Sequence, residues 1–383
     1  MANSNLTAAK KAKNDEFYTQ YHDIEKEINA YLDFDPDVFR GKTLLLPCDD
    51  PEWSNFTKFF AQNFERLGLN KLISTSYAID SKPIKEGYQV TMFEESAPQY
   101  DRLKTTKHGK IFTLTRDLSG DGKIDVNDLE WRYLDGDGDF KSKEVKKLRD
   151  EADIIITNPP FSLFRDFLAW IVEAGKQFVI IGNMNAITYK EVFPLIKENK
   201  MWLGNGFHAG NAFFSTPYAE EYGEGVYNPE TGLVKFRNVC WFTNLDHGRR
   251  HQPMQLMTMT ENLRFNKKLR ENSAYEVYEN YNGIEVSFTD AIPSDHDGIM
   301  GVPISFLDKY SPDQFEIIGM CDNEDMYDLK TKVYTTQECK EAYFAKFGKK
   351  GTYDLNARAV VIRDGLKEKI YSRVLIKHKN PQS

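Results

Sequence analysis

The chain has 383 residues, of which 40% are hydrophobic, and a formal net charge of −8. Its length predicts about two domains, and its ordinary apolar content indicates a globular protein with a sizeable core. The sequence has no apolar run long enough to span a membrane and no signal-peptide pattern at its start, so we expect a cytoplasmic protein with no membrane partner.

The N-terminal half alternates between predicted strands and helices. The predicted elements are an extended segment that continues as an amphipathic helix over 14–32, a helix over 55–68 that ends at Gly68, and apolar strands over 41–47, 71–79 and 176–184. Apolar strands that alternate with helices indicate a parallel sheet covered on both faces. We therefore expect an α/β domain over residues 1–204.

The amino-acid composition of the sequence changes at about residue 205. Glycine, asparagine, proline and aromatic residues become more frequent, and the predicted strands become short and irregular. These strands cover residues 234–245, 315–320, 358–364 and 369–379. We expect a second, mostly β or irregular, domain over residues 205–383.

Residues 152–170 (ADIIITNPPFSLFRDFLAW) change from a buried strand to a helix, with Asn158, Pro159, Pro160 and Phe161 between the two. Prolines fix φ and lack an N–H group, so this pair ends the strand and stiffens the loop. Ligands of open α/β sheets bind at the carboxyl ends of strands. Here Asn158 offers an acceptor and a donor, the carbonyl of Pro159 lacks a ladder partner, and Phe161 could stack on a flat ligand. The alternative is a proline turn with a core phenylalanine.

These four residues resemble the (Asp/Asn/Ser)-Pro-Pro-(Tyr/Phe) motif of amino-group methyltransferases. The exocyclic amine of adenine is a poor nucleophile because its lone pair is delocalised into the ring. Two acceptors, the Asn158 side-chain oxygen and the Pro159 carbonyl, can bind its two N–H groups and favour a pyramidal nitrogen. Catalysis is then mostly positioning and electrostatics, with S-adenosylmethionine as the methyl donor. A base in a duplex must be flipped out to reach such a loop, with Phe161 as its stacking platform.

The resemblance extends over about residues 10–320. It is carried by DEFYT (15–19), PCDDPEWSNF (47–56), GDF (138–140), NPPFSLF (158–164), GNMNAITYKEVFPLIKENKMWLG (182–204) and GVPISFLDKYSPDQFEIIG (301–319). Together these segments resemble the EcoRI-type adenine-specific DNA methyltransferase family. The resemblance implies a Rossmann-like sheet, S-adenosylmethionine as cofactor, double-stranded DNA as partner and N6-methyladenine as product. It also implies a bacterial, phage or plasmid origin. A defence role beside a cognate restriction endonuclease, which need not bind the enzyme, and a stand-alone regulatory role are both open, since they need the same enzyme.

The resemblance further implies a set of cofactor contacts. Phe17 and Thr19 would close over the methionine end, and Asp49 or Asp50 would bind the cationic amino group. The remaining candidates are Ser54 and Asn55 at a helix start, Ser76 and Tyr77 beside the ribose, with Asp80 as the nearest acid, and Asp139 at the adenine. Most methyltransferases have a glycine-rich turn after the first strand, whereas residues 48–56 contain no glycine.

An acidic insert over residues 115–137 contains a second motif. Its residues 117–128 (DLSGDGKIDVND) fit a calcium loop, in which the ligands would be Asp117, Ser119, Asp121, the Lys123 carbonyl and Asp128. The last ligand is aspartate in place of the usual glutamate, which shortens its reach. We expect either a structural calcium ion or an acidic turn. Cysteines and histidines do not cluster, so no zinc site is expected.

Basic residues gather in the C-terminal half. Residues 235–270 contain eight Lys/Arg and two acids, and residues 340–383 contain eleven Lys/Arg and four acids. Such patches suit a polyanion, although a solvated surface is the alternative. The candidate DNA contacts are Arg237, Arg249, Arg250, Lys267, Lys268 and Arg270.

Two rival functions remain open from the sequence. An RNA adenine or protein glutamine methyltransferase would use the same loop on another planar nitrogen. A calcium-binding interaction protein would use the acidic insert, with residues 158–161 as a simple turn. The long second domain and its basic stretches favour duplex DNA over a protein substrate, and the strand before residues 158–161 argues against the calcium-binding protein.

Overall fold

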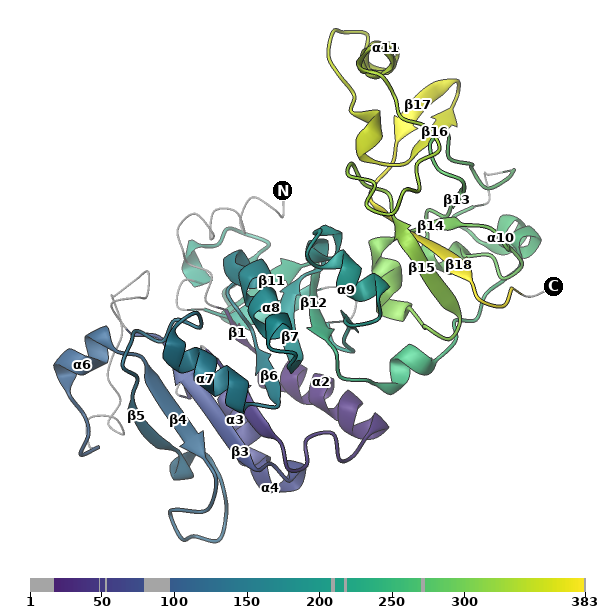
Figure 1. The fold of residues 1–383 in the computed structure, drawn as a ribbon. Helices are drawn as coiled ribbons and strands as arrows, with labels where there is room; N and C mark the ends of the chain where they lie inside the picture. The colour runs from purple at the N-terminus through teal and green to yellow at the C-terminus, as the bar shows by residue number, and fades with distance from the viewer. Residues whose placement is uncertain are drawn as a thin grey trace. The chain divides into compact units, whose positions relative to one another are not determined.

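The computed structural model divides the chain into two compact units. The first comprises residues 1–192 and 201–248, and the second comprises residues 193–200 and 249–383 (Figure 1). The structure describes residues 17–47, 49–51, 54–78, 97–207, 211–216, 219–269 and 273–381. Residues 205–248 therefore belong to the first unit, and the chain changes unit near residue 248.

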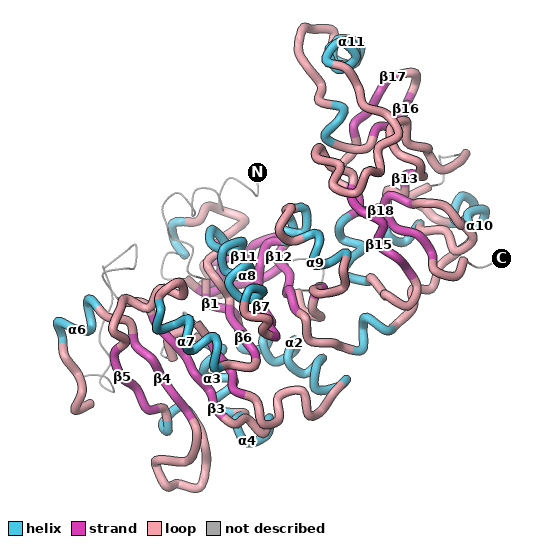
Figure 2. Tube along the Cα trace, in the orientation of Figure 1, coloured by secondary structure: helices cyan, strands magenta, loops and turns pink. Residues whose placement is uncertain are grey.

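The first unit is built on an eight-stranded sheet with the order β5-β4-β3-β2-β6-β7-β12-β8 (Figure 2). Its strands are β2 (Thr43–Leu46), β3 (Lys71–Ser76), β4 (Lys110–Leu114), β5 (Glu130–Tyr133), β6 (Ile154–Thr157), β7 (Gln177–Asn183), β8 (Trp202–Leu203) and β12 (Val239–Thr243). The four central strands β3, β2, β6 and β7 are parallel, whereas β4, β5 and β12 pair antiparallel with their neighbours. The predicted α/β class is confirmed, but the sheet is mixed, and parallel only at its centre.

The apolar central strands explain why helices are needed on this sheet. Every residue of β2 and β6 is buried, so both faces of these strands must be covered. The helices of this unit are α2 (Tyr21–Phe34), α3 (Asn55–Gln62), α4 (Phe64–Leu67), α6 (Arg102–Lys107), α7 (Lys143–Glu151) and α8 (Phe164–Glu173). α3 contacts β3, α7 contacts β2 and α8 contacts β7. In Figure 1, α7 and α8 lie in front of the sheet. The helix predicted over 55–68 is divided into α3 and α4, and α4 ends at Gly68, which has φ +64°.

A small sheet brings the start of the described chain to residues far along the sequence. Its order is β1-β9-β11-β10, with β1 (Tyr18–Thr19), β9 (Asn211–Ser215), β10 (Tyr227–Asn228) and β11 (Leu233–Arg237). β1 pairs antiparallel with β9, so that Tyr18 lies opposite Ser215. The predicted strand over 234–245 is two strands, because Asn238 between them has φ +59° and turns the chain.

The second unit contains a four-stranded sheet and a hairpin. The sheet has the order β13-β14-β18-β15, from β13 (Ile284–Glu285), β14 (Met300–Pro303), β15 (Phe315–Met320) and β18 (Arg373–His378). The hairpin pairs β16 (Val360–Arg363) with β17 (Leu366–Lys369). The helices are α9 (Phe193–Lys197), α10 (Met259–Phe265) and α11 (Thr336–Phe347). Among the described helices of both units, none has the length and apolar content that crossing a membrane requires.

Candidate active site

The candidate residues lie where the strand order of the large sheet reverses. β2 pairs with β3 on one side and with β6 on the other, where Leu45 is opposite Ile155. The chain passes from β2 outward to β3, and from β6 outward to β7, in opposite directions across the sheet. Open α/β sheets bind ligands at the carboxyl ends of strands at such a reversal. Pro47, Asp49 and Asp50 follow the end of β2, and residues 158–161, here called the NPPF loop, follow the end of β6.

The NPPF loop is held by its first residue. The side-chain Nδ2 of Asn158 donates a 2.7 Å hydrogen bond to the carbonyl oxygen of Phe17. Because a carbonyl oxygen can only accept, the amide nitrogen faces Phe17, and Oδ1 faces away from it. Beyond Pro160 a 3₁₀ turn over Phe161–Leu163 leads into α8. The loop is therefore fixed at both ends, with an acceptor turned away from the N-terminal segment.

Phe161 is buried, with only 7% of its surface exposed. Its ring stacks on that of Phe17, with centroids 5.8 Å apart and an interplanar angle of 28°. The ring of Phe214 contacts Phe161 edge-on, with centroids 6.4 Å apart. One face of the predicted stacking platform is therefore covered by Phe17.

Asp49 is the most strongly perturbed acid near the loop. It is buried, and its carboxylate accepts 2.6 Å hydrogen bonds from the hydroxyls of Ser54 and Thr157. Burial raises the pKa of Asp49 to about 7, against the opposing effect of the two hydroxyls, and the charge of Asp50 adds to the rise. A buried carboxylate with a raised pKa at a strand end is well suited to a cationic ligand.

Three neighbours of Asp49 were not among the sequence candidates. Thr157 binds its carboxylate, and the hydroxyls of Thr57 and Ser74 donate to its backbone carbonyl. Thr157 ends the apolar strand β6, and a polar residue in such a strand is a signal that could have identified it. Thr57 and Ser74 are buried polar residues of α3 and β3, which contain other polar residues, so the sequence does not single them out. Ser54 caps α3 by accepting from the N–H of Phe56, as the sequence predicted.

The N-terminal segment crosses this site. The side-chain Nδ2 of Asn55 donates a 2.8 Å hydrogen bond to the carbonyl of Thr19. The amides of Asn55 and Asn158 therefore hold alternate carbonyls, those of Thr19 and Phe17, of one short stretch. Thr19 is 2% exposed, and among the described residues its hydroxyl has no hydrogen-bond partner. A buried hydroxyl of this kind fits a polar ligand.

The predicted ribose and adenine contacts come together at the end of β3. Gly138 has φ +93°, and a Cβ there would lie 2.5 Å from the carbonyl oxygen of Ser76, so only glycine allows this approach. The N–H of Ala78 also donates to the carbonyl of Asp137. These contacts bring the backbone just before Asp139 against Ser76 and Tyr77, and the carboxylate of Asp139 accepts from the N–H of Lys141. Asp80 lies outside the described residues.

The acidic insert gives no support to a calcium site. The carboxylate of Asp117 accepts from the N–H groups of Gly120 and Gly122, and that of Asp128 from those of Leu118, Ser119 and Asp125. These backbone donors hold the pKa of Asp128 below its usual range. No group of three or more His, Cys, Asp or Glu in the described parts of the chain is placed to hold a metal ion. The loop is closed by Asx-type turns, so its acids already have partners.

The basic candidates differ in their surroundings. Arg237 and Lys267 are exposed, whereas Arg249 pairs with Asp308 at 2.7 Å and Lys268 with Asp290 at 2.9 Å. Arg250 is 5% exposed and donates to Asn199, so its charge is turned into the protein. Arg270 lies outside the described residues.

Comparisons with known proteins agree with this geometry. A family model described as "Adenine-specific methyltransferase EcoRI" matches residues 5–379. The chain is 41% identical to Type II methyltransferase M.EcoRI of Escherichia coli over 330 residues, which cover 85% of this chain and 92% of that protein. It is 34% identical to Type II methyltransferase M.MpnI of Mycoplasma pneumoniae, over 85% of this chain and 89% of that protein. No solved structure gives a significant match. The family predicted from the motifs is thus confirmed, and the chain belongs to the EcoRI-type adenine-specific methyltransferases and is a DNA adenine methyltransferase.

Proposed function

We propose that the protein transfers a methyl group from S-adenosylmethionine to N6 of an adenine in a specific sequence of duplex DNA, and that the NPPF loop carries the reaction. The observation behind this is the hydrogen bond from Asn158 to the Phe17 carbonyl. It turns Oδ1 of Asn158 away from Phe17, where it can accept from a substrate N–H. Activity on RNA or on protein glutamine would use the same acceptor, but the family favours DNA.

The NPPF loop would act through two oxygens. Oδ1 of Asn158 and the carbonyl of Pro159 would accept the two N–H groups of the exocyclic amine. These bonds favour a pyramidal nitrogen, whose lone pair is then localised for attack. Because both acceptors belong to a stiff loop, they need little reorganisation during the reaction. The N–H proton becomes acidic only as the new bond forms, so no strong base is needed beside Asn158.

The residues around Asp49 fit the cofactor. When bound, S-adenosylmethionine supplies a methyl group that is activated by a sulfonium charge. Asp49 would hold the cationic amino group, and the hydroxyl of Thr19 would contact the methionine end. Asp50, Ser54 and Asn55 would flank the same end of the cofactor, and Phe17 would close over it. At the end of β3, Ser76 and Tyr77 would face the ribose, and Asp139 the adenine.

The substrate base would stack on Phe161, as the motif implies. In this structure Phe17 occupies one face of that ring. Only the side chain of Phe17 needs to move to open this face, because its bond to Asn158 is made by the backbone. We infer that the Phe17 ring swings away when the flipped adenine enters, while the orientation of Asn158 is preserved.

The sheet topology supports a Rossmann-like methyltransferase fold. The central order β3-β2-β6-β7 is parallel, and β12 runs antiparallel between β7 and β8. We assign cofactor binding and catalysis to residues 1–204 and target recognition to residues 205–383. Residues 205–248 would contribute to both functions, since they pack in the first unit.

Labelled S-adenosylmethionine tests the proposal directly. Duplex DNA incubated with the purified protein should gain label as N6-methyladenine at one sequence, which sequencing of the methylated DNA would identify. Asn158→Ala should lower the rate of labelling by at least about 10²-fold while cofactor binding persists. Label in RNA or protein, or methylation at another atom of DNA, would refute the proposal. The "Type II" relatives suggest protection from a cognate endonuclease, and digestion of the methylated DNA would test this role.

A further inference from the structure

The second unit contains a cavity of about 700 Å³. It lies between β13, the β16–β17 hairpin and the segment before β18. Its lining residues are Glu285, Ser287, Ala357, Arg358, Arg363, Glu368, Lys369, Ile370, Tyr371, Ser372 and Arg373. Four cations therefore face two carboxylates, and none of these residues belongs to the active site described above.

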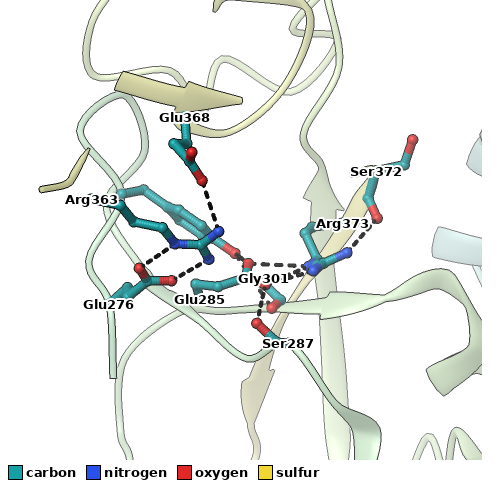
Figure 3. Close-up of polar contacts among 9 residues, drawn as sticks. Glu276, Glu285, Ser287, Gly301, Arg363, Glu368, Ser372 and Arg373 are labelled. Atoms are coloured by element: carbon teal, nitrogen blue, oxygen red, sulfur yellow. Dashed lines mark hydrogen bonds and ion pairs between the residues drawn. The ribbon is translucent and has the colours of Figure 1, made fainter. Parts of the chain in front are cut away.

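The wall near β13 and β18 is a buried ion pair. Glu285 is 4% exposed and Arg373 is 8% exposed, and Nη2 of Arg373 lies 2.6 Å from Oε1 of Glu285 (Figure 3). Tyr278 donates to the same carboxylate at 2.5 Å, and Ser287 donates at 2.9 Å. The charge of Glu285 is thus neutralised inside the protein and is not available to attract a cation.

The second carboxylate of the cavity is also neutralised. Glu368 accepts from Nη1 of Arg363 at 3.0 Å and pairs with Lys346 at 2.8 Å. Arg363 in turn holds Glu276 through two 2.6 Å hydrogen bonds (Figure 3). These partners connect the hairpin to α11 and to the segment before β13, so Arg363 has a structural role.

Two cations of the lining are left without a counter-charge. Within the described residues, neither Arg358 nor Lys369 forms an ion pair with a carboxylate. Arg358 donates only to the carbonyl of its neighbour Ala357, and the Lys369 ammonium lies 5.3 Å from the ring centre of Tyr353. Both side chains are half-buried, which strengthens their field toward a ligand.

An exposed tyrosine stands beside these cations. Tyr371 is 86% exposed, although it follows the buried Ile370 and precedes Ser372 and the buried Arg373. Most of its ring and its hydroxyl therefore face solvent. A large aromatic side chain held out in this way is typical of a surface that meets a macromolecule.

We propose that this cavity is part of the DNA interface, where Arg358 and Lys369 neutralise phosphates of the substrate duplex and Tyr371 packs against the same strand. This inference rests on the proposed function and adds the location of a surface that contacts the DNA. Arginine, lysine, tyrosine and serine are the side chains that bind DNA phosphates. Because the whole chain carries a net charge of −8, uncompensated cations in one place must supply the local attraction. An outward tyrosine favours a long polyanion over a small enclosed anion.

The salt dependence of DNA binding tests the proposal. A short labelled duplex of mixed sequence is titrated with the full-length protein at several NaCl concentrations, and fluorescence anisotropy gives the association constant. Each of Arg358→Gln and Lys369→Gln should reduce the slope of log K against log salt by about 0.9, because one phosphate contact is lost. Tyr371→Ala should weaken binding and leave the slope unchanged. Thermal melting confirms that each variant is folded.

A matched control is Lys340→Gln, which removes an exposed charge of α11 outside the cavity and should leave the slope as in wild type. If the wild type methylates DNA and both cavity variants keep the wild-type slope, this inference is overturned and the proposed function still stands. A wild type that methylates no DNA would instead refute the proposed function. Inorganic phosphate that raises the melting temperature of wild type but not of the double variant, with duplex binding equal in both, would also overturn it in favour of a small-anion site.

Discussion

The side-chain nitrogen of Asn158 lies 2.7 Å from the carbonyl oxygen of Phe17, although the two residues are 141 positions apart. The bond has a direction, since Nδ2 donates and the carbonyl accepts. It therefore turns Oδ1 of Asn158 away from Phe17, which is the end of the amide that we propose faces the substrate.

Asn158→Asp separates the two roles of the amide. The carboxylate keeps an acceptor for the substrate amine but places a second oxygen against the Phe17 carbonyl. We expect kcat to fall by roughly 10²-fold at neutral pH, since a positioned hydrogen-bonding group contributes on this scale. Once protonated, the introduced carboxyl group could donate to Phe17 again, so kcat relative to wild type should recover as the pH is lowered. The pH profile of single-turnover methylation measures this.

Asn158→Ala is the control for that profile, because alanine can neither donate nor accept. Its residual activity should follow the pH dependence of wild type. Equal recovery of both variants in acid would show that orientation by Phe17 is not the cause.

Asp49→Asn should stabilise the protein above neutral pH. Burial raises the pKa of Asp49 to about 7, so the ionised form is disfavoured in the folded state. The contribution of a raised pKa to stability is fully present below the ordinary value of an aspartate and is lost as the pH rises through 7. The variant should therefore gain free energy of unfolding relative to wild type at pH about 8, up to roughly 4 kcal/mol, and nothing in acid. Urea unfolding at both pH values measures the difference.

Asp49→Asn should also weaken the binding of S-adenosylmethionine. A cationic ligand favours ionised Asp49, so the affinity of wild type for S-adenosylmethionine should rise as the pH passes through 7. Asp49→Asn should bind more weakly and with no such rise, as calorimetry would show. A variant that binds as tightly as wild type at every pH would remove Asp49 from the cofactor site.

Phe17→Ala should destabilise the first unit. The ring is 6% exposed and contacts the rings of Phe161, Phe214 and Phe236. Loss of a buried phenylalanine costs about 3–5 kcal/mol. Phe213→Ala is the matched control in the same small sheet, because that ring is 43% exposed, and it should cost less than about 1 kcal/mol. Equal costs in thermal unfolding would contradict the burial of Phe17.

Arg373→Met should be among the most destabilising substitutions of the second unit. It leaves the carboxylate of Glu285 buried without its counter-charge, which costs about 3–5 kcal/mol. The double variant Glu285→Gln/Arg373→Met should recover most of this loss. Lys268→Met offers a comparison, since it breaks an exposed pair with Asp290 and should cost at most about 1 kcal/mol. Additive costs in the double variant would show that the two buried groups act independently.

The sequence predicted the parts of the site that are local in the chain. The position of the NPPF loop follows from the apolar strand before it and the helix after it, and the cap at Ser54 follows from its place before α3. The bond between Thr157 and Asp49 joins residues 108 positions apart, so no local pattern indicates it. Phe161 is covered by the ring of Phe17, which is also distant in the sequence, so no local pattern indicates this contact either.

The acidic insert shows that one spacing of acids can fit two different structures. Its spacing matches a calcium loop at every ligand position, but the same carboxylates are equally good acceptors for backbone N–H groups. In the structure the carboxylates of Asp117 and Asp128 accept hydrogen bonds from backbone N–H groups. The pattern of acids fits a tight turn as well as it fits a metal site, and the contacts of Asp117 and Asp128 are those of a turn.

The short stretch from Phe17 to Thr19 makes the enzyme a candidate for splitting into fragments. A protein that began after Thr19 would keep the whole eight-stranded sheet and the NPPF loop, yet it would lose the carbonyls that hold the amides of Asn55 and Asn158. Since β1 joins its sheet through pairing with β9, a synthetic peptide containing this stretch could add back as an edge strand. Methylation would then depend on the concentration of the peptide, which would make the missing strand a chemical switch for the enzyme.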